Sequence, residues 1–271
     1  MSPFRLTLAG AALLLLAAGG GAWWWLARGA PEEALPTPPE PVRLVESPDY
    51  ERCLEMVEDD PEGARGFADA WAMRGGGEAA AHCAALALLT LGQAERAAEA
   101  LERIATRSQA GIAARAAVFG QAGGAWIAAG RPDRAHAALS LALALLPADA
   151  TLLTERAMAS LSLDRAEEAL ADADQAIAAD GSRAEAWVIR AAALRRLERT
   201  GAAAESIAQA LRLEPDNVEA LLERGIIRQM QGDARGARAD WERVIELAPD
   251  GAAADLAAQN MALIEAGPLR R

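Results

Sequence analysis

Residues 184–217 read AEAWVIRAAALRRLERTGAAAESIAQALRLEPDN, and residues 218–251 read VEALLERGIIRQMQGDARGARADWERVIELAPDG. When the two stretches are aligned, large apolar residues, small residues and prolines fall at the same positions, which form the columns of a repeat. The period is 34, and the matching pairs are Trp187 and Leu221, Ala191 and Gly225, Ala203 and Ala237, Ala210 and Val244, and Pro215 and Pro249. A fixed period of this length predicts a repeat architecture built from one supersecondary unit.

The same period extends toward the N-terminus. Its columns continue at Phe119 and Leu153, Gly123 and Ala157, Ala135 and Ala169, and Ala142 and Ala176. Pro147 precedes Pro215 by two periods, and the position between them holds Gly181, another residue that breaks helices. Each period contains two helix-length stretches between such breakers, so the fold is predicted to be all-α.

The pattern resembles the tetratricopeptide repeat (TPR) family, whose unit is a 34-residue helix–turn–helix. On this resemblance Gly130 and Gly232 close first helices, and the prolines end second helices. The resemblance implies a TPR-type helical solenoid over 78–251, with a degenerate helical unit before it and one capping helix after it. The expected boundaries are 49–77 for the degenerate unit, 78–111, 116–149, 150–183, 184–217 and 218–251 for the repeats, and 252–266 for the capping helix.

Four positions depart from the family pattern. Asp164 and Glu198 stand where a first helix usually ends in glycine, and Gln109 and Gly181 stand where proline is usual. We expect these departures to alter local turns and to leave the array intact.

Two motifs predict capped helix starts. The sequences from Ser182 to Glu185 and from Asp216 to Glu219 have the spacing of a capping box, in which the two side chains bond each other's backbone N–H groups.

The composition excludes several classes of protein. All 27 basic residues are Arg, and both a phosphate-binding P-loop and Schiff-base chemistry require a Lys. Aromatic residues make up 4% of the chain, too few for a β-sandwich or barrel, and two Cys are too few for a disulfide-dense scaffold. With no catalytic motif either, we expect no enzyme activity, no cofactor and no metal site.

The N-terminus predicts a membrane anchor over 1–28. Leu6 to Ala27 is an uncharged run, which as a helix spans about 33 Å and can cross a hydrocarbon core of about 30 Å. Trp23, Trp24 and Trp25 suit the membrane–water interface. The alternative is a cleaved signal peptide, but the apolar run is too long, and the tryptophans occupy the place of the small residues that cleavage needs. The sequence favours a retained single-pass transmembrane helix.

Residues 29–48 predict an extended linker. Six prolines and several glutamates in this stretch favour a polyproline-like spacer. At about 3.1 Å per residue it would hold the body up to roughly 60 Å from the bilayer.

Charge indicates the partners that the body avoids and the side of the membrane that it occupies. Residues 29–271 carry 25 Arg against 39 Asp and Glu, a net charge of −14. Nucleic acid and anionic lipid would repel such a body, so we expect no nucleic-acid partner and attachment to the membrane through the anchor alone. The short basic N-terminus favours a cytoplasmic N-terminus and an exported body. The Ala-rich composition, with Arg as the only basic residue, suggests a bacterial source, so we expect an inner-membrane protein with a periplasmic body.

Cys53 and Cys83 lie on different predicted helices and form no C-x-x-C motif. In an exported body they could form a structural disulfide; the alternatives are two buried thiols or, as a different function, a thiol redox pair. His82 adjoins Cys83, but neighbouring residues on a helix point in different directions, which argues against a metal site.

Three arginines, Arg156, Arg190 and Arg224, recur at a spacing of 34. They could form a basic strip that grips an acidic peptide. We favour the alternative that they pair with Asp172 and Asp240, which recur in phase on the second helices.

By its resemblance to TPR proteins, the array is expected to bind peptides or proteins in a groove lined by first helices. From the repeat phase, the predicted groove residues are Thr151, Thr154, Met158, Glu185, Val188, Ala192, Arg195, Leu222, Ile226 and Gln229. The favoured function is a membrane-tethered scaffold or adaptor for envelope protein assembly. A second hypothesis is the TPR subunit of cytochrome c maturation, which presents apocytochrome, and a third is a redox protein that uses Cys53 and Cys83.

Overall fold

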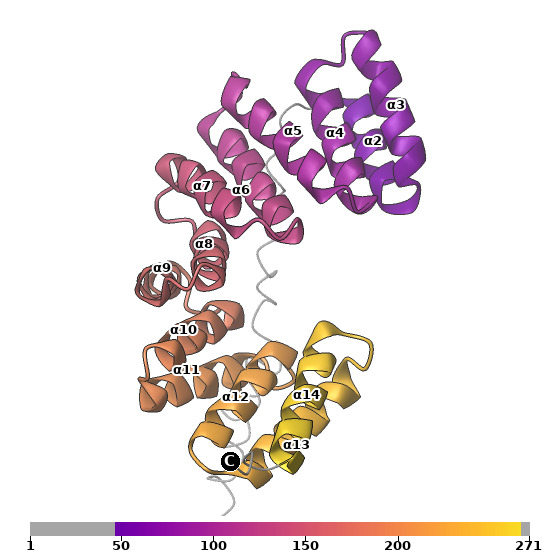
Figure 1. Cartoon of the computed structure of the whole chain (residues 1–271). Coiled ribbons are helices and arrows are strands. Elements are labelled where there is room, and N and C mark those ends of the chain that lie inside the picture. Colours follow the sequence, from indigo (N-terminus) through magenta and orange to yellow (C-terminus); the bar gives the residue numbers. More distant parts are fainter. Residues whose placement is uncertain (1–46, 267–271) are drawn as a thin grey trace, which may run out of the picture. The chain divides into compact units, whose positions relative to one another are not determined.

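A computed structural model describes residues 47–266, and every regular element in this part of the chain is an α-helix. Thirteen helices follow one another within these residues (Figure 1). They are α2 (Pro48–Asp59), α3 (Pro61–Met73), α4 (Gly77–Thr90), α5 (Ala94–Arg107), α6 (Ile112–Ala128), α7 (Pro132–Leu145), α8 (Ala150–Ser162), α9 (Ala166–Ala179), α10 (Ala184–Arg196), α11 (Thr200–Leu213), α12 (Val218–Met230), α13 (Ala234–Leu247) and α14 (Ala252–Ala266).

The predicted anchor at 1–28 lies outside the described residues, as does the linker up to residue 46. Within 47–266, no helix combines the length and the apolar character that crossing a membrane requires.

The helices pack in pairs, and each expected repeat unit contains one pair. Extensive contacts join α6 to α7, α8 to α9, α10 to α11 and α12 to α13, and each pair also packs on the next (Figure 1). The described residues therefore form an all-helical solenoid of helix–turn–helix units, as the repeat pattern predicts. Below, the helix that opens each unit is its first helix, and the other is its second.

The turn inside each unit contains one residue with positive φ. Gly130 and Gly232 have φ angles of 68° and 85° there, and Asp164 and Glu198 occupy the same position with φ angles of 59° and 60°. Left-handed backbone costs a residue with a side chain about 1–2 kcal/mol relative to its preferred conformation. The departures from glycine therefore make two turns less favourable but do not change their geometry.

Close packing within a unit depends on the small column of the first helix. A Cβ atom added to Gly225 would lie 2.2 Å from Nε1 of Trp241, and one added to Gly123 would lie 2.5 Å from Cγ of Leu139. Both Trp241 and Leu139 are fully buried, so neither can move aside without opening the core. The glycines allow each first helix to approach its second helix this closely.

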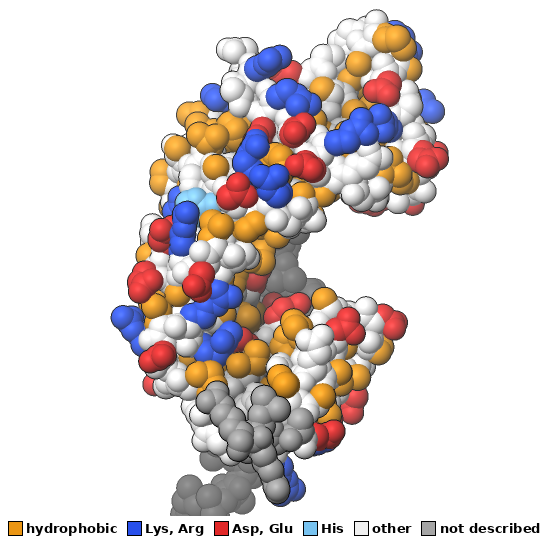
Figure 2. All heavy atoms as spheres, viewed as in Figure 1, with side chains coloured by type: hydrophobic (Ala, Val, Ile, Leu, Met, Phe, Trp, Pro, Cys, Tyr) orange, Lys and Arg blue, Asp and Glu red, His pale blue; other side chains and the backbone are white. Residues whose placement is uncertain are grey.

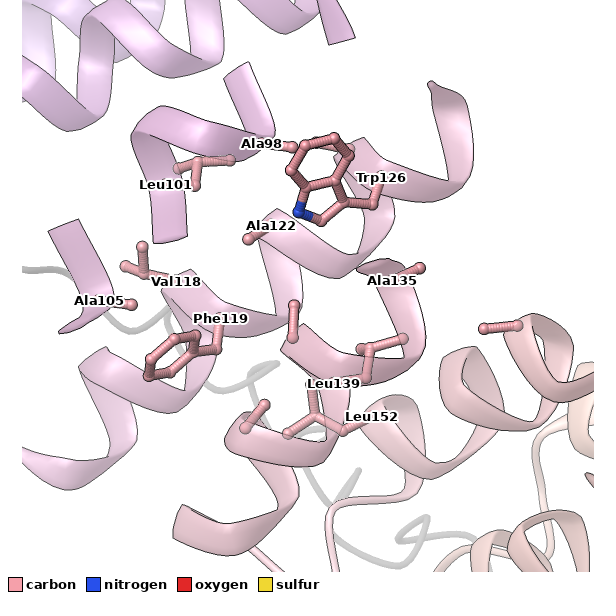
Figure 3. Close-up of a cluster of buried hydrophobic side chains, with 14 of the residues drawn as sticks. Ala98, Leu101, Ala105, Val118, Phe119, Ala122, Trp126, Ala135, Leu139 and Leu152 are labelled. Carbon is pink, nitrogen blue, oxygen red and sulfur yellow. The ribbon is translucent and has the colours of Figure 1, made fainter. Parts of the chain in front are cut away.

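One apolar cluster connects α5, α6, α7 and α8. Figure 3 shows Phe119 and Trp126 of α6 beside Leu101 of α5, Leu139 of α7 and Leu152 of α8. Because each unit contributes residues to its neighbour's core, no unit buries its apolar surface alone. Among the large residues of the array, Trp126, Leu139, Ile207 and Trp241 are buried, whereas Trp187 is half-buried and donates its indole N–H to the carbonyl of Gly181.

The predicted capping boxes are wrong. The N-cap of α10 is Arg183, whose side chain makes no capping hydrogen bond, because Ser182 lies one residue earlier and its hydroxyl donates to Asp180 instead. The N-cap of α12 is Asn217, whose side chain accepts from the N–H of Ala220. Each motif lies one residue too early in the sequence, since only the residue at the cap itself can reach the free N–H groups of the first turn.

The two ends of the array differ. At its start, α2 and α3 pack on α4 through a separate cluster that includes Tyr50, Cys53 and Trp71. At its end, α14 packs on α12 and α13 and covers Trp241 and Val244 with one face. A terminal unit would otherwise expose this apolar surface to water.

Two neighbouring glycines of α6 test the packing argument. Gly123→Ala should lower the free energy of unfolding by about 1–3 kcal/mol, because its methyl group overlaps Leu139. Gly124→Ala is the matched control, since no atom lies within 4 Å of its Cβ position; it should raise the free energy by about 0.5–1 kcal/mol through reduced backbone freedom in the unfolded chain. Chemical denaturation followed by circular dichroism measures both, and equal effects would refute the packing argument.

Candidate functional site

The first helices α8, α10, α12 and α14 form one continuous surface, here called the first-helix face. Each contacts the next first helix directly, whereas the second helices α9, α11 and α13 make at most marginal contacts with one another. The first helices therefore lie closer together, on the inner side of the local curve of the solenoid. All ten predicted groove residues belong to α8, α10 and α12.

The predicted groove residues differ in accessibility. Thr151, Glu185 and Gln229 are exposed. Half-buried positions are occupied by Met158, Val188, Ala192, Arg195, Leu222 and Ile226. These residues present a mainly apolar strip with polar positions at its ends.

Thr154 does not belong to the accessible surface. Its side chain is 1% exposed, and its hydroxyl donates to the carbonyl of Ala150 one helical turn earlier, at 2.7 Å. Its repeat phase is the same as that of Val188 and Leu222, but the short side chain is covered by its neighbours. Thr154 is therefore removed from the predicted groove.

Arg195 has a partner inside the protein. Its guanidinium donates to both carboxylate oxygens of Glu223 on the next first helix, at 2.5 and 3.3 Å. Glu223 is buried, so removal of Arg195 would leave an uncompensated buried charge. The pair joins α10 to α12 and is not a free cation for a ligand.

The repeat phase also identifies two residues that the sequence analysis missed. Leu256 and Leu263 of α14 lie one repeat period after Leu222 and Gln229, and their side chains are 49% and 66% exposed. They extend the apolar strip of the first-helix face onto the capping helix. Continuation of the groove columns past residue 251 would have found them.

Glu155 of α8 lies beside the start of α10. Burial, with smaller contributions from nearby Glu185 and Asp149, raises the pKa of its carboxyl to about 7, and Arg183 acts in the opposite direction. The Oε2 atom is buried and has no hydrogen-bond partner among the described residues. The equivalent position of α10 holds Ile189 and that of α12 holds Glu223, which is buried and paired with Arg195, so the repeat pattern does not single out Glu155.

The arginine ladder pairs with carboxylates of the second helices, as the favoured interpretation predicts for two of its members. Arg156 donates twice to Asp172 at 2.7 and 2.8 Å, and Arg224 donates twice to Asp240 at 2.7 and 3.0 Å. The equivalent second-helix position in the middle unit is a serine. The third arginine, Arg190, donates to the hydroxyl of that residue, Ser206, and to Asp174, each at 2.7 Å. The ladder is therefore structural and not a basic strip for a ligand.

A buried disulfide joins α2 to α4. Cys53 and Cys83 are bonded, their Cα atoms are 6.2 Å apart, and neither residue is exposed. Thiol exchange requires access to a sulfur atom, so this burial favours a structural bond over the redox hypothesis.

A hydrogen-bonded chain runs beside the disulfide. Nδ1 of His82 is 2.7 Å from the Tyr50 hydroxyl, and Nε2 is 2.6 Å from Oε1 of Gln121 on α6. An amide oxygen only accepts, so Nε2 donates to it and Nδ1 accepts from tyrosine. Burial lowers the pKa of His82, which keeps the ring neutral. No sequence pattern indicates this network, because its members lie 32 and 39 residues apart and outside the repeated columns.

Comparisons with known proteins agree with this geometry. Residues 184–217 match the family model described as tetratricopeptide repeat. Similar solved structures include a chain of the APC/C hetero-tetramer Cut9–Hcn1, with 17% identity over 78% of this chain and 42% of that one, and a TM-score of 0.61. Another is a MamA fragment from Desulfovibrio magneticus RS-1, with 20% identity over 62% of this chain and 93% of that one, and a TM-score of 0.52.

A third similar structure is the second TPR domain of human RPAP3, solved with an HSP70 peptide. It is 32% identical over 44% of this chain and 98% of that one, with a TM-score of 0.42. A comparison with curated proteins finds no match.

The pKa of Glu155 gives a pH-dependent prediction. Unfolded glutamate ionises near pH 4.5, whereas the folded carboxyl keeps its proton up to about pH 7. Its stabilising contribution is therefore complete below pH 4.5 and is lost as the pH rises through 7. Glu155→Gln stays neutral, so it should raise the free energy of unfolding at pH 8 by about 1–3 kcal/mol and change it little at pH 5.

Denaturant titration of the wild-type chain and the variant at both pH values measures this difference. Glu205→Gln on α11 is the control, because that carboxylate is exposed and should show the same small effect at pH 5 and pH 8. A Glu155→Gln variant with equal effects at the two pH values would show that the residue is ionised in the folded protein.

Proposed function

Because this chain is a tetratricopeptide repeat protein, we propose that it is a membrane-tethered scaffold or adaptor that binds a protein or peptide segment on its first-helix face. The observation that carries this proposal is the uncovered apolar strip of that face. It continues over four successive first helices, and its last two members, Leu256 and Leu263, are about half exposed or more. Contiguous exposed apolar surface of this kind is typical of interaction sites.

Binding accounts for the described side chains better than catalysis does. Within residues 47–266 no group of three or more His, Cys, Asp or Glu side chains could hold a metal ion. Two of the arginines that recur in phase form ion pairs with second helices, Arg156 with Asp172 and Arg224 with Asp240. We therefore propose a non-enzymatic role in which the array positions its partner.

The proposed tether is the uncharged run from Leu6 to Ala27, followed by the proline-rich linker. This arrangement would hold the array at a distance from the bacterial inner membrane, where it could assist the assembly of envelope proteins. The disulfide between Cys53 and Cys83 supports a periplasmic body, since such bonds persist in oxidising compartments. The strong negative charge of the body supports a partner other than nucleic acid.

Site-directed photocrosslinking tests the binding face. A photoreactive amino acid at Leu222 or Gln229 of α12 should capture one partner in cells, because both positions lie on the first-helix face. The matched controls are Glu205 of α11 and Glu242 of α13, exposed positions on second helices. Crosslinks should be at least ten-fold stronger at the first-helix positions, and equal capture at all four would argue against this face as the binding site.

The tether is tested by deletion of residues 2–28. The full chain should sediment with inner membranes and resist extraction by high salt, because its attachment is hydrophobic. The shortened chain should remain in the soluble fraction. Loss of the full chain from membranes in high salt would indicate adsorption by charge and contradict the proposed anchor.

A further inference from the structure

The apolar strip of the first-helix face extends over α8, α10, α12 and α14. Figure 2 shows hydrophobic side chains among the surface atoms over this part of the molecule. The strip consists of the half-buried residues Met158, Val188, Leu222 and Ile226 and the exposed residues Leu256 and Leu263. The exposure of the two leucines shows that no helix of the described segment 47–266 covers this end of the strip. A partner that covers it must bring apolar side chains of its own.

The arginines at this face are already engaged by acids. Arg195 is held by Glu223 at 2.5 Å, and Nη2 of Arg183 lies 3.7 Å from Oε2 of Glu185. An acidic ligand would have to displace these carboxylates from their arginines. The face therefore offers little to a ligand that binds through its own negative charge.

Carboxylates lie at the edge of the same face. Glu185 and Glu219 occupy the same repeat position in the first turns of α10 and α12, and both are exposed. Glu185 is also the partner of Arg183, so a basic ligand competes with that arginine at this position. The surrounding segment, residues 150–266, contains 13 Arg and 21 Asp and Glu, a net charge of −8. The segment that carries the apolar strip is therefore acidic overall, and complementary charge on a partner is positive.

We propose that the segment bound by this face is an amphipathic helix of a partner protein, with an apolar stripe against the strip and Lys or Arg on its flanks. This inference rests on the proposed function and specifies the chemistry of the partner. The apolar stripe contacts Leu222, Ile226, Leu256 and Leu263, and the basic flanks lie beside the exposed glutamates at the edge. An apolar helix face in an apolar strip is a common mode of peptide recognition, and the edge charges fix its position and orientation.

Three synthetic peptides, each long enough for about five helical turns, test the proposal with the full chain in detergent. One has Leu on one helical face and Lys on the other, the second has Leu and Glu in the same pattern, and the third contains the Leu and Lys residues in scrambled order. Fluorescence anisotropy of labelled peptides gives the dissociation constants. The Leu/Lys peptide should bind at least ten-fold more tightly than either of the others, and its affinity should fall when the salt concentration is raised.

Two pairs of variants locate the binding. Leu256→Ser with Leu263→Ser should weaken binding of the Leu/Lys peptide at least ten-fold, and both residues are exposed enough to be replaced without loss of the fold. Glu185→Gln with Glu219→Gln should weaken it about five-fold and reduce its salt dependence. The controls are the single change Leu141→Ser on α7 and the double change Glu167→Gln with Glu205→Gln on α9 and α11, which make changes of the same kind on second helices and should have no effect.

The proposal is overturned if the Leu/Glu peptide binds as tightly as the Leu/Lys peptide, if no peptide binds, or if the second-helix variants weaken binding as much as the first-helix variants. These outcomes are distinct from failure of the proposed function. A single partner crosslinked at Leu222 but with an acidic binding segment would preserve the scaffold role and refute only the proposed chemistry of the ligand.

Discussion

Inside each helical pair of the array, a residue of the first helix faces the residue sixteen positions later on the second helix, and the two must share a limited volume. Two of the four facing pairs show this directly, since a methyl group on Gly225 or Gly123 would overlap Trp241 or Leu139. The four pairs are Gly123 and Leu139, Ala157 and Ala173, Ala191 and Ile207, and Gly225 and Trp241. The largest residue, tryptophan, faces a glycine, and each pair has Gly or Ala on its first helix. The distance between the helices of a pair depends on this constraint.

The same sixteen-residue spacing also brings polar and charged side chains of the two helices together. On the first helices these residues lie one position before Ala157, Ala191 and Gly225. Arg156 meets Asp172, Arg224 meets Asp240, and Arg190 meets Ser206, so the ladder of arginines lies at the junction between first and second helices. Arg190 needs a second acceptor, Asp174, because serine carries no charge. The guanidinium groups of the ladder are thereby held against the second helices.

Much of this fold could be predicted from the period of 34, because packing within and between units repeats with the sequence. Features that do not repeat were harder to predict. The network of Tyr50, His82 and Gln121 joins α2, α4 and α6 and does not recur in the later units, and the raised pKa of Glu155 depends on burial beside α10. The capping-box predictions were wrong for a different reason. The motif was matched one residue before the true N-cap, but only the residue at the N-cap itself can make the capping hydrogen bond.

The position of a residue in the repeat predicts which face of its own helix it occupies. A long side chain, however, reaches into the next unit. Arg195 belongs to the first-helix face by phase, and yet its guanidinium is bound by Glu223 of α12. Thr154 shows the opposite limit, since its side chain is too short to emerge from its neighbours. Arg195 and Thr154 therefore offer no free polar group to a ligand in the predicted groove. Side chains of intermediate size, such as Leu222 and Ile226, remain accessible there. The accessible part of the face is therefore more apolar than its sequence, read by phase alone, would indicate.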